Sequence, residues 1–409
     1  MLSFKEYLIE AAKEGKNLHL EHLEDEILNF GVDLGRGGIE ILQTLRDMFK
    51  GGQGSKLNVT VKWDGAPAIV CGKNPENGKF FVGSKSVFNK TPKINYSIGD
   101  IRKNHKGGVA DKLAVALKHL KTLPIKGILQ GDMMFGPGDV KTKSIDGVSH
   151  YTFTPNTITY AVEVGSELAN QISRAKIGIV FHTEYTGATL PEMTANFGYS
   201  VRGLQPTADV WYDDANYKDV SGIATLTPSE EKAIDGTIAT GRTTLKKVGP
   251  KMDQVLQAEF AKFIKPFINN NVRAGEQVGE PTKFLQDFMN YYNDKMNKEV
   301  EKLKGGAESP AAQKRFEKIE QQKKFLADNS NTLLLTLAVY RRIISAKLLL
   351  ISKLSNVDKI GTFVKTENGY RVTNHEGFVA FGIDGGAVKL NDRMEFNALN
   401  FSATKTWSK

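Results

Sequence analysis

The sequence predicts an α+β protein in which a mostly antiparallel β region is interrupted by a long helical block and then resumes. Three observations support this fold class. Short apolar runs separated by Gly, Pro and Asn fill residues 56–226. Amphipathic patterns with a helical period then run over residues 227–355. Strand-like runs with hairpin turns return in residues 356–409 and complete the β region.

Residues 1–50 are expected to form an N-terminal helical element, because Ile41, Leu42, Leu45 and Met48 recur at helical spacing. A Gly-rich break, "KGGQGS", separates this element from the β region. Six strand candidates then follow, "LNVTVKW", "PAIVCG", "KFFVGSK", "GILQGDMMF", "TITYAVEV" and "KIGIVFHTEY". One helix is predicted among them, over residues 108–123.

The helical block is expected to begin at Thr227 and Pro228, which suit the N-cap and first-turn positions of a helix. Its most apolar part, residues 331–355, contains Arg341, Arg342 and Lys347, which predicts a buried or interface helix and no membrane span. In the last segment, "ENG" and "IDGGAV" are predicted to be hairpin turns. Residues 227–355 are therefore read as an all-helical insertion between two parts of one core.

The composition excludes several classes of protein. The 409 residues carry a formal net charge of +9, which permits binding to a polyanion. Cys71 is the single cysteine, which excludes disulfides within the chain and Cys-based zinc sites. The first residues are charged throughout and contain no apolar signal core, so an intracellular, cytoplasmic location is expected.

One stretch raises a chemical question. In "VKWDGAPAIVCG", Lys62 stands at the end of a predicted strand and is followed by Asp64 and Gly65. Five further stretches follow in order, "FVGSKS", "QGDMMFG", "GIVFHTEY", "HEGFVAF" and "GAVKLND". They place a basic residue, an acid, aromatic residues, a Glu-Gly pair and a strand lysine after the first motif.

This ordered set resembles the covalent nucleotidyltransferase superfamily, which includes ATP-dependent DNA ligases, RNA ligases and mRNA capping enzymes. The resemblance covers residues 56–204 and 356–395. It implies a ligase-type adenylyltransferase core of antiparallel sheets around an ATP cleft. It also implies that Lys62 takes the nucleotide, with Asp64 and Gly65 completing the first motif. The opening residues and general texture also resemble proteins of large tailed phages.

The same resemblance assigns roles to the later stretches. Lys85 stands where the family carries a basic residue, and Lys389 matches the lysine that contacts the α-phosphate. Asp132 matches the acid that binds the ribose. Phe181, or its neighbour His182, would match the aromatic residue that stacks on the base.

The metal expectation also follows from the resemblance. Glu376, with Gly377 after it, matches the motif whose glutamate serves the metal. Asp64 is the second candidate ligand. Carboxylates suit Mg²⁺ or Mn²⁺, because these hard ions prefer oxygen ligands and keep several waters.

Attack of a lysine on a phosphate requires these residue types independently of any family. A lysine amine has an ordinary pKa of about 10.4, so little of it is neutral at pH 7. Desolvation and nearby positive charge both lower this pKa, which makes the amine a nucleophile. Lys85, Lys389 and a divalent cation would supply that charge and would also offset charge on the α-phosphate.

The sequence departs from the family pattern near its end. A second lysine is expected two places from Lys389, but Ala387 and Asn391 occupy these positions, and Arg393 is the nearest substitute. The helical block is longer than usual. No room is left for the OB-fold that follows the core in DNA ligases, which favours an RNA-ligase-like enzyme over a DNA ligase.

Each candidate also has a structural interpretation. Lys62 and Lys389 would then be solvated strand lysines, Asp132 a turn residue and Glu376 the start of a hairpin. Phe181 would be a core side chain. His182 would be a structural histidine, which is the interpretation favoured for it.

The predicted function is an ATP-dependent polynucleotide ligase that forms lysyl-AMP on Lys62. It would join 5′-phosphate to 3′-hydroxyl ends of RNA or DNA. The basic residues of 89–108, with aromatic neighbours, suit a surface for nucleic-acid ends. Two alternatives remain: transfer to another acceptor, as in capping or protein or small-molecule adenylylation, and an inactive nucleic-acid-binding phage protein. The sequence leaves the oligomeric state open.

Overall fold

The computed structural model describes residues 22–49, 57–217, 226–303, 308–355, 360–366, 369–372, 375–382 and 387–397. The chain divides into two compact units. Unit 1 comprises the described parts of Met1–Leu57, Thr225–Lys353 and Gly386–Ser402. Unit 2 comprises the described parts of Asn58–Ala224, Leu354–Gly385 and Ala403–Lys409. The α+β prediction is confirmed, since helices and several antiparallel sheets are both present.

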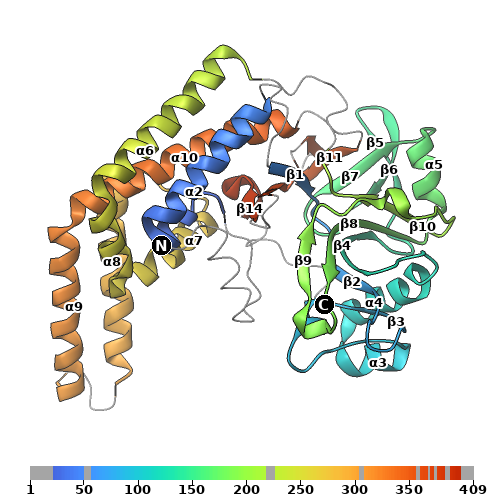
Figure 1. Cartoon of the computed structure of the whole chain (residues 1–409), viewed down its shortest axis with the longest axis horizontal. Coiled ribbons are helices and arrows are strands. Elements are labelled where there is room, and N and C mark those ends of the chain that lie inside the picture. Colours follow the sequence, from blue (N-terminus) through green and yellow to red (C-terminus); the bar gives the residue numbers. More distant parts are fainter. Residues whose placement is uncertain are drawn as a thin grey trace. The chain divides into compact units, whose positions relative to one another are not determined.

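Unit 1 is mainly helical. Its helices are α2 (Glu26–Phe49), α6 (Pro228–Gln257), α7 (Ile264–Arg273), α8 (Pro281–Glu301), α9 (Pro310–Asp328) and α10 (Ser330–Leu354) (Figure 1). A short 3₁₀ turn, Glu259–Phe263, connects α6 to α7. The strand β14 (Ala387–Leu390) and a single π-turn, Arg393–Asn397, belong to the same unit.

The start of α6 confirms the predicted helix start. Thr227 is the N-cap, and its hydroxyl accepts a hydrogen bond from the Glu230 N–H. The Glu230 carboxylate accepts one from the Thr227 N–H at 2.8 Å, which completes a capping box. Pro228 occupies the first turn, where its missing N–H costs nothing.

The helix α10 is buried along one side, as its apolar sequence predicts. Leu333, Leu337, Tyr340 and Leu350 are fully buried on it. Lys347 lies on the same helix and is buried as well. Among the helices of the described ranges, none combines the length and apolarity needed to cross a membrane.

Unit 2 contains a six-stranded sheet. Its strands are β2 (Ala68–Lys73), β3 (Phe80–Gly83), β4 (Ile128–Phe135), β8 (Ile177–Thr186), β9 (Thr194–Phe197) and β10 (Val210–Asp214). The order is β10-β8-β4-β2-β3, with β9 paired to β8. The β10–β8 pair is parallel and the other pairs are antiparallel.

A five-stranded antiparallel sheet lies in the same unit. Its order is β12 (Gly369–Val372), β11 (Gly361–Thr366), β7 (Thr159–Glu163), β6 (Val148–Phe153) and β5 (Lys141–Ile145). The strand β1 (Leu57–Lys62) pairs separately with β13 (Gly377–Gly382). This pairing brings together two stretches from opposite ends of the sequence.

Three helices complete unit 2, namely α3 (Ile98–Asn104), α4 (Gly107–Leu120) and α5 (Glu167–Arg174). The apolar face of α4, with Leu113 and Leu117, packs against Ile69 and Ile179 of the six-stranded sheet. Cys71 lies in this core, and burial raises the pKa of its thiol to about 12. It therefore behaves as a small apolar side chain.

All six strand candidates are confirmed, as β1, β2, β3, β4, β7 and β8, and the helix predicted over 108–123 is α4. The hairpin of β5 and β6 was not predicted. Its strands are largely exposed and polar, so they lack apolar alternation. Its turn residues Asp146 and Gly147 both have positive φ, 51° and 82°, which is the type I′ geometry favoured by Asp-Gly.

The predicted segments and the compact units agree near residues 226 and 355 but differ elsewhere. The helix α2 belongs to the helical unit because it packs along α6. The strand β14 also belongs to that unit, where the Leu23 N–H donates to the Lys389 carbonyl at 3.2 Å. Residues 1–21 and the "IDGG" turn lie outside the described residues.

Candidate functional site

The candidate site in unit 2 begins with an ion pair. Lys62 is the last residue of β1, and Glu376 directly precedes its partner strand β13. The Lys62 ammonium pairs with the Glu376 carboxylate. The Lys62 side chain is 28% exposed and that of Glu376 is 11% exposed, so the pair is reachable from solvent but largely desolvated.

The loop after Lys62 rests directly on β4. A Cβ atom at Gly65 would lie 2.5 Å from the Cβ of Asp132, so only glycine fits without a shift. The Ala66 N–H donates to the Met133 carbonyl at 3.0 Å, and Ala68 is the register partner of Asp132. This packing brings Asp132 next to the first motif, as the sequence predicts for one site.

A lysine from α4 holds the same loop. Lys112 Nζ donates to the Ala66 carbonyl oxygen at 2.9 Å. Burial lowers the pKa of Lys112, while the charge of Asp139 raises it, and the net direction is down. This contact could not be predicted from the sequence, because nothing there distinguishes Lys112 from the other polar residues of an amphipathic helix.

Asp64 is buried and anchors the loop to the segment before β7. Its carboxylate accepts hydrogen bonds from the side-chain amide of Asn156 and from the N–H groups of Thr157 and Ile158, at 2.6–2.7 Å. The Asp64 N–H donates to the Tyr160 hydroxyl at 2.7 Å. Both carboxylate oxygens therefore already accept bonds, and a metal-binding role for Asp64 stays a prediction.

Asp132 and His182 form a second polar pair. His182 Nε2 lies 3.7 Å from Asp132 Oδ2, and its Nδ1 lies 2.7 Å from the Thr183 hydroxyl. The register between β4 and β8 shifts at this point, which leaves His182 in a β-bulge opposite Gly131. Val180 is the register partner of Asp132, and strand alternation places His182 on the same face of the sheet.

The two groups of this pair have shifted pKa values. Burial raises the pKa of Asp132 to about 7, with Lys62 and Lys85 opposing the shift and Asp64 adding to it. Burial, together with Lys85 and Lys62, lowers the pKa of His182 to about 4. His182 is therefore neutral at pH 7, and its contact with Asp132 is polar without being an ion pair.

Lys85 is near enough to Asp132 and His182 for its charge to affect both. It opens a short 3₁₀ helix, Lys85–Phe88, whose N-cap Ser84 accepts the Ser86 N–H. The Lys85 side chain is exposed. The structure thus groups Lys85 with Lys62, Asp132 and Glu376 in unit 2.

Phe181 does not lie with these charged groups. It is fully buried in the hydrophobic core beneath α4, with Ile179 and Met133. Alternate residues of a strand face opposite sides of the sheet, so Asp132 and Val180 lie on the other face. Of the two aromatic candidates, His182 is the one that lies beside Asp132.

An aromatic pair that the sequence analysis did not single out lies at another part of this sheet. Phe88 and Tyr185 are half-buried with ring centroids 4.3 Å apart. The Tyr185 hydroxyl donates to Gln130 Oε1 at 2.7 Å. The alternation of β4 places Gln130 on the same face as Asp132, a signal that was readable from the sequence once the strand was known.

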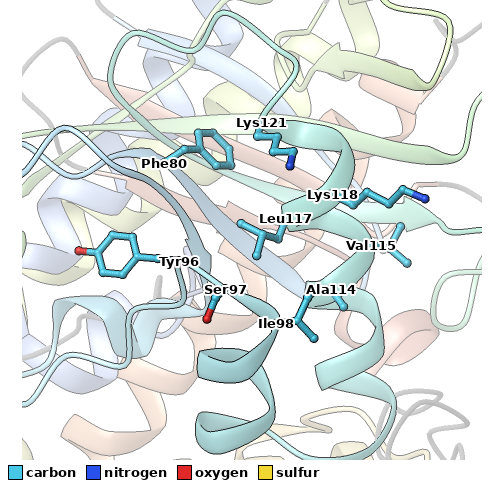
Figure 2. Close-up of a pocket in the computed structure, with 9 residues that line it drawn as sticks. All are labelled: Phe80, Tyr96, Ser97, Ile98, Ala114, Val115, Leu117, Lys118 and Lys121. Atoms are coloured by element: carbon cyan, nitrogen blue, oxygen red, sulfur yellow. The ribbon is translucent and has the colours of Figure 1, made fainter.

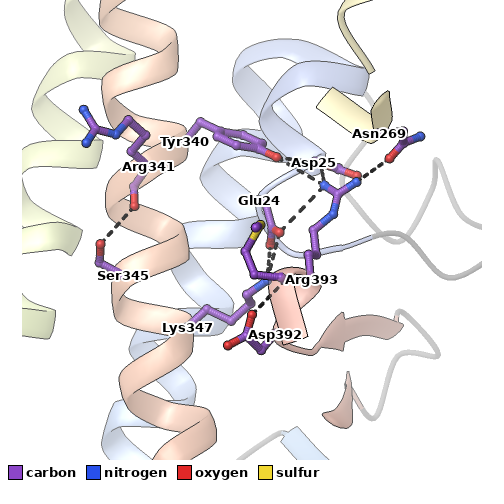
Figure 3. A network of polar contacts seen from close by, with 10 residues as sticks. Glu24, Asp25, Asn269, Tyr340, Arg341, Ser345, Lys347, Asp392 and Arg393 are labelled. Atoms are coloured by element: carbon purple, nitrogen blue, oxygen red, sulfur yellow. Dashed lines mark hydrogen bonds and ion pairs between the residues drawn. The ribbon is translucent and has the colours of Figure 1, made fainter. Parts of the chain in front are cut away.

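Lys389 lies in unit 1, on β14. The division into units assigns it to the helical unit, and its contact with an α-phosphate stays a prediction. Arg393, the substitute for the second lysine, is buried in a polar network of unit 1 (Figure 3). Its Nη1 donates to Asp25 Oδ1 at 2.8 Å and its Nη2 to Asn269 Oδ1 at 2.6 Å.

The charge state of Lys62 is set by opposing effects. Burial lowers the pKa of its amine, but the charge and hydrogen bond of Glu376, with the charges of Asp132 and Asp64, outweigh burial and raise it. Burial also raises the pKa of Glu376, against the opposing charge of Lys62. With these partners alone, Lys62 is a cation at neutral pH.

The carboxylates here suit a hard divalent cation. Mg²⁺ takes one or two protein carboxylates together with waters and substrate phosphates, so it needs no dedicated cage. Among the described residues, no group of three or more His, Cys, Asp or Glu side chains forms such a cage. Glu376 is partly exposed beside Lys62 and fits a ligand shared with phosphate oxygens.

Comparison with protein families matches residues 17–405 to the family of unknown function DUF6267. Neither the curated proteins nor the solved structures that were compared gave a match. Because the match extends over almost all of the sequence, the chain belongs to the DUF6267 family.

Proposed function

We propose that this protein is an ATP-dependent nucleotidyltransferase that forms a covalent lysyl-AMP on Lys62. One observation carries the proposal: Lys62 is paired with Glu376 at a partly open position, and Asp132, His182 and Lys85 are electrostatically coupled around them. Strongly shifted pKa values in one cluster of mixed charges favour a functional site over a solvated surface.

The proposed step uses the Lys62 amine as nucleophile. Its proton leaves to solvent, which the partly exposed side chain reaches. Nζ then forms a bond to the α-phosphorus of ATP, the bond from that phosphorus to the bridging oxygen breaks, and the electron pair leaves with pyrophosphate. Lys85 would stabilise the negative charge on the phosphate as the bonds exchange.

A divalent cation bound with ATP would supply further charge neutralisation at the phosphates. Glu376 would hold it, with Asp64 as the second predicted ligand. Engaging Glu376 in this way weakens its ion pair with Lys62, which removes the largest effect that raises the pKa of the amine. The site thus supports a nucleophile that is activated when nucleotide and metal bind.

The acceptor follows from the resemblance. AMP would pass to a 5′-phosphate end, and a 3′-hydroxyl would displace it to join the strands. The basic composition of the chain is compatible with such a polyanion. RNA ends and DNA ends are both candidate acceptors, and the transfer experiment described below distinguishes them.

Labelling with α-³²P-ATP tests the proposed intermediate. The full chain is incubated with labelled ATP and Mg²⁺ or Mn²⁺, separated on a denaturing gel and mapped by peptide. The label is expected on Lys62, stable to alkali and labile to acid, as a phosphoramidate is. Lys62→Ala and Lys62→Arg should abolish it, while Lys126→Ala, an exposed lysine of the same unit, should not.

Two results would redirect the proposal. Labelling from α-³²P-GTP in place of ATP would indicate a capping-type enzyme. Absence of any label, with saturable ATP binding retained, would indicate a binding protein in which the Lys62–Glu376 ion pair keeps the amine protonated. Transfer of label from the protein to 5′-phosphorylated RNA or DNA would then decide the acceptor.

A further inference from the structure

A groove of about 570 Å³ lies in unit 2 outside the candidate site. It runs along the exposed side of α4, between the start of β3 and the start of α3 (Figure 2). The residues that line it are Phe80, Tyr96, Ser97, Ile98, Ala114, Val115, Leu117, Lys118 and Lys121. None of the proposed catalytic residues is among them.

The floor of the groove is aliphatic. Ala114, Val115 and Leu117 contribute from α4, and Ile98 contributes from the first turn of α3. Ile98 is 49% exposed, the highest value among the exposed large apolar residues of the described chain. Contiguous exposed apolar surface marks interaction sites more than single exposed side chains do, and Ile98 is continuous with the apolar α4 residues of this groove.

The charges that line the groove have one sign. Lys118 and Lys121 stand three residues apart on α4, so they are neighbours on the helix surface. No described lining residue carries a carboxylate. The nearest acids along the chain are already occupied, since Asp100 caps α3 and Asp111 pairs with Arg102 at 2.8 Å.

The aromatic residues argue against nucleic acid as the occupant. Single-stranded nucleic acid is held by bases stacked on exposed aromatic rings. The Tyr96 hydroxyl accepts hydrogen bonds from the amides of Asn74 and Asn77, and its ring packs edge-on against Phe81. Of the two rings among the described lining residues, Phe80 is therefore the one left for stacking with a base. The other residues of the floor are aliphatic and suit aliphatic side chains.

We propose that this groove binds an acidic amphipathic segment of a partner protein. Its apolar residues would cover Ile98, Val115 and Leu117, and its carboxylates would pair with Lys118 and Lys121. An amphipathic helix laid in a groove is a recurrent mode of such recognition. The rim charges would contribute orientation and association rate, and the apolar floor would contribute most of the affinity.

Fluorescence anisotropy with defined probes tests this inference on the full chain. The probe is a labelled synthetic peptide with Leu at helical spacing on one face and Glu on the other. The same composition in scrambled order removes the apolar face, and a version with Lys in place of Glu reverses the charge. Binding is expected for the first peptide and is expected to weaken as salt increases.

Variants assign the binding to the groove. Lys118→Glu with Lys121→Glu should weaken the affinity about tenfold, because two favourable charge contacts become repulsive. Ile98→Asp should weaken it similarly, and an acid in the first turn of α3 suits the helix, so folding is retained. The matched controls are Lys141→Glu with Lys176→Glu, and Val148→Asp, which alter exposed residues elsewhere in unit 2.

Three results would overturn the inference. Equal affinity for the designed and the scrambled peptide would do so, as would an affinity unchanged by the groove variants. The third is binding of a labelled single-stranded oligonucleotide that the same lysine variants abolish, which would assign the groove to nucleic acid. Circular dichroism and nucleotide labelling of each variant show whether the fold is retained, independently of peptide binding.

Discussion

Each unit of this protein contains a lysine–glutamate ion pair, and the two pairs differ in what surrounds them. In unit 1, Lys347 donates to both oxygens of Glu24 at 2.8 Å, and the two side chains are 1% and 0% exposed. Asp25 and Arg393 form a second pair beside it, and Tyr340 donates to Asp25 (Figure 3). Two carboxylates thus face two cations in a closed, balanced network.

In unit 2, the Lys62–Glu376 pair is partly open. Asp64 and Asp132 place two more acidic side chains near Lys62, and Lys85 is a second cation near Asp132. A balanced buried network satisfies its charges internally and serves the fold. In a partly open cluster with surplus carboxylates, the pKa values of the members are shifted, and a cation from a ligand can bind. The closed, balanced pair is assigned to the fold, whereas the partly open pair is the one that we propose to be functional.

The largest difference between the two ion pairs is expected when Lys62 and Lys347 are each replaced by methionine. Lys62→Met is expected to abolish covalent labelling by α-³²P-ATP, because the amine is the proposed nucleophile. Its free energy of unfolding should change little, since Glu376 remains within reach of water. Labelling by this variant at the parent level would remove Lys62 from the mechanism.

Lys347→Met is expected to lower the free energy of unfolding while labelling is retained. It leaves the buried Glu24 carboxylate with the longer 3.9 Å contact to Arg393, and breaking a buried ion pair typically costs about 3–5 kcal/mol. Urea unfolding followed by circular dichroism measures this loss, and labelling should persist below the unfolding transition. A loss under about 1 kcal/mol would show that the network contributes little to stability.

Gly65→Ala tests how tightly the loop after Lys62 packs on β4. The added methyl group would meet Asp132 at 2.5 Å, so the loop or β4 must move, at a cost of about 1–3 kcal/mol. Gly236→Ala is the matched control in α6, where a Cβ meets nothing within 4 Å. That change should stabilise the protein by about 0.5–1 kcal/mol, because alanine favours a helix interior. Chemical denaturation of both variants measures the difference in sign.

The smallest effect is expected in the pH dependence of stability. The folded-state pKa of Asp132, about 7, lies above its unfolded value of about 3.9, so its contribution falls as pH rises between the two. The folded-state pKa of His182, about 4, lies below its unfolded value of about 6.5, so its contribution rises over that range. The two slopes oppose each other in the parent protein.

Asp132→Asn removes the falling slope and leaves the rising one. Stability of this variant should therefore increase more steeply than that of the parent from pH 4.5 to 6.5, measured by urea unfolding in a pH series. Asp111→Asn, an exposed acid on α4, serves as the control. Parallel pH curves for Asp132→Asn and the parent would mean that burial does not raise the pKa of Asp132 as described.

The sequence predicted the fold where apolar periodicity reflects burial. The strands β2, β4 and β8 and the helix α4 carry clear apolar residues, so they were predicted, whereas β9 and β10 of the same sheet were not. The hairpin of β5 and β6 was not, because its side chains are mostly exposed. The assignment of α2 and β14 to the helical unit depends on packing between distant segments, which local patterns do not contain.

The site was predictable in part for a similar reason. Lys62 and Glu376 were identified as functional candidates in one ordered motif set, and the structure pairs their side chains. Phe181, or its neighbour His182, was predicted to stack on the base, and strand alternation places Phe181 in the core and His182 on the Asp132 face. The contact of Lys112 with the loop was not predicted, because Lys112 is one of several similar polar residues on α4.

The three hydrogen bonds to the Asp64 carboxylate have a mechanical consequence. Asp64 follows β1 and leans on β4 through its neighbour Gly65, while its bonding partners at 156–158 lead directly into β7 of the five-stranded sheet. The segment that bears Lys62 is therefore held by hydrogen bonds on one side and by packing on the other. A hinge motion that separates the two sheets would first have to break the hydrogen bonds of Asp64. Such a motion would also displace Lys62.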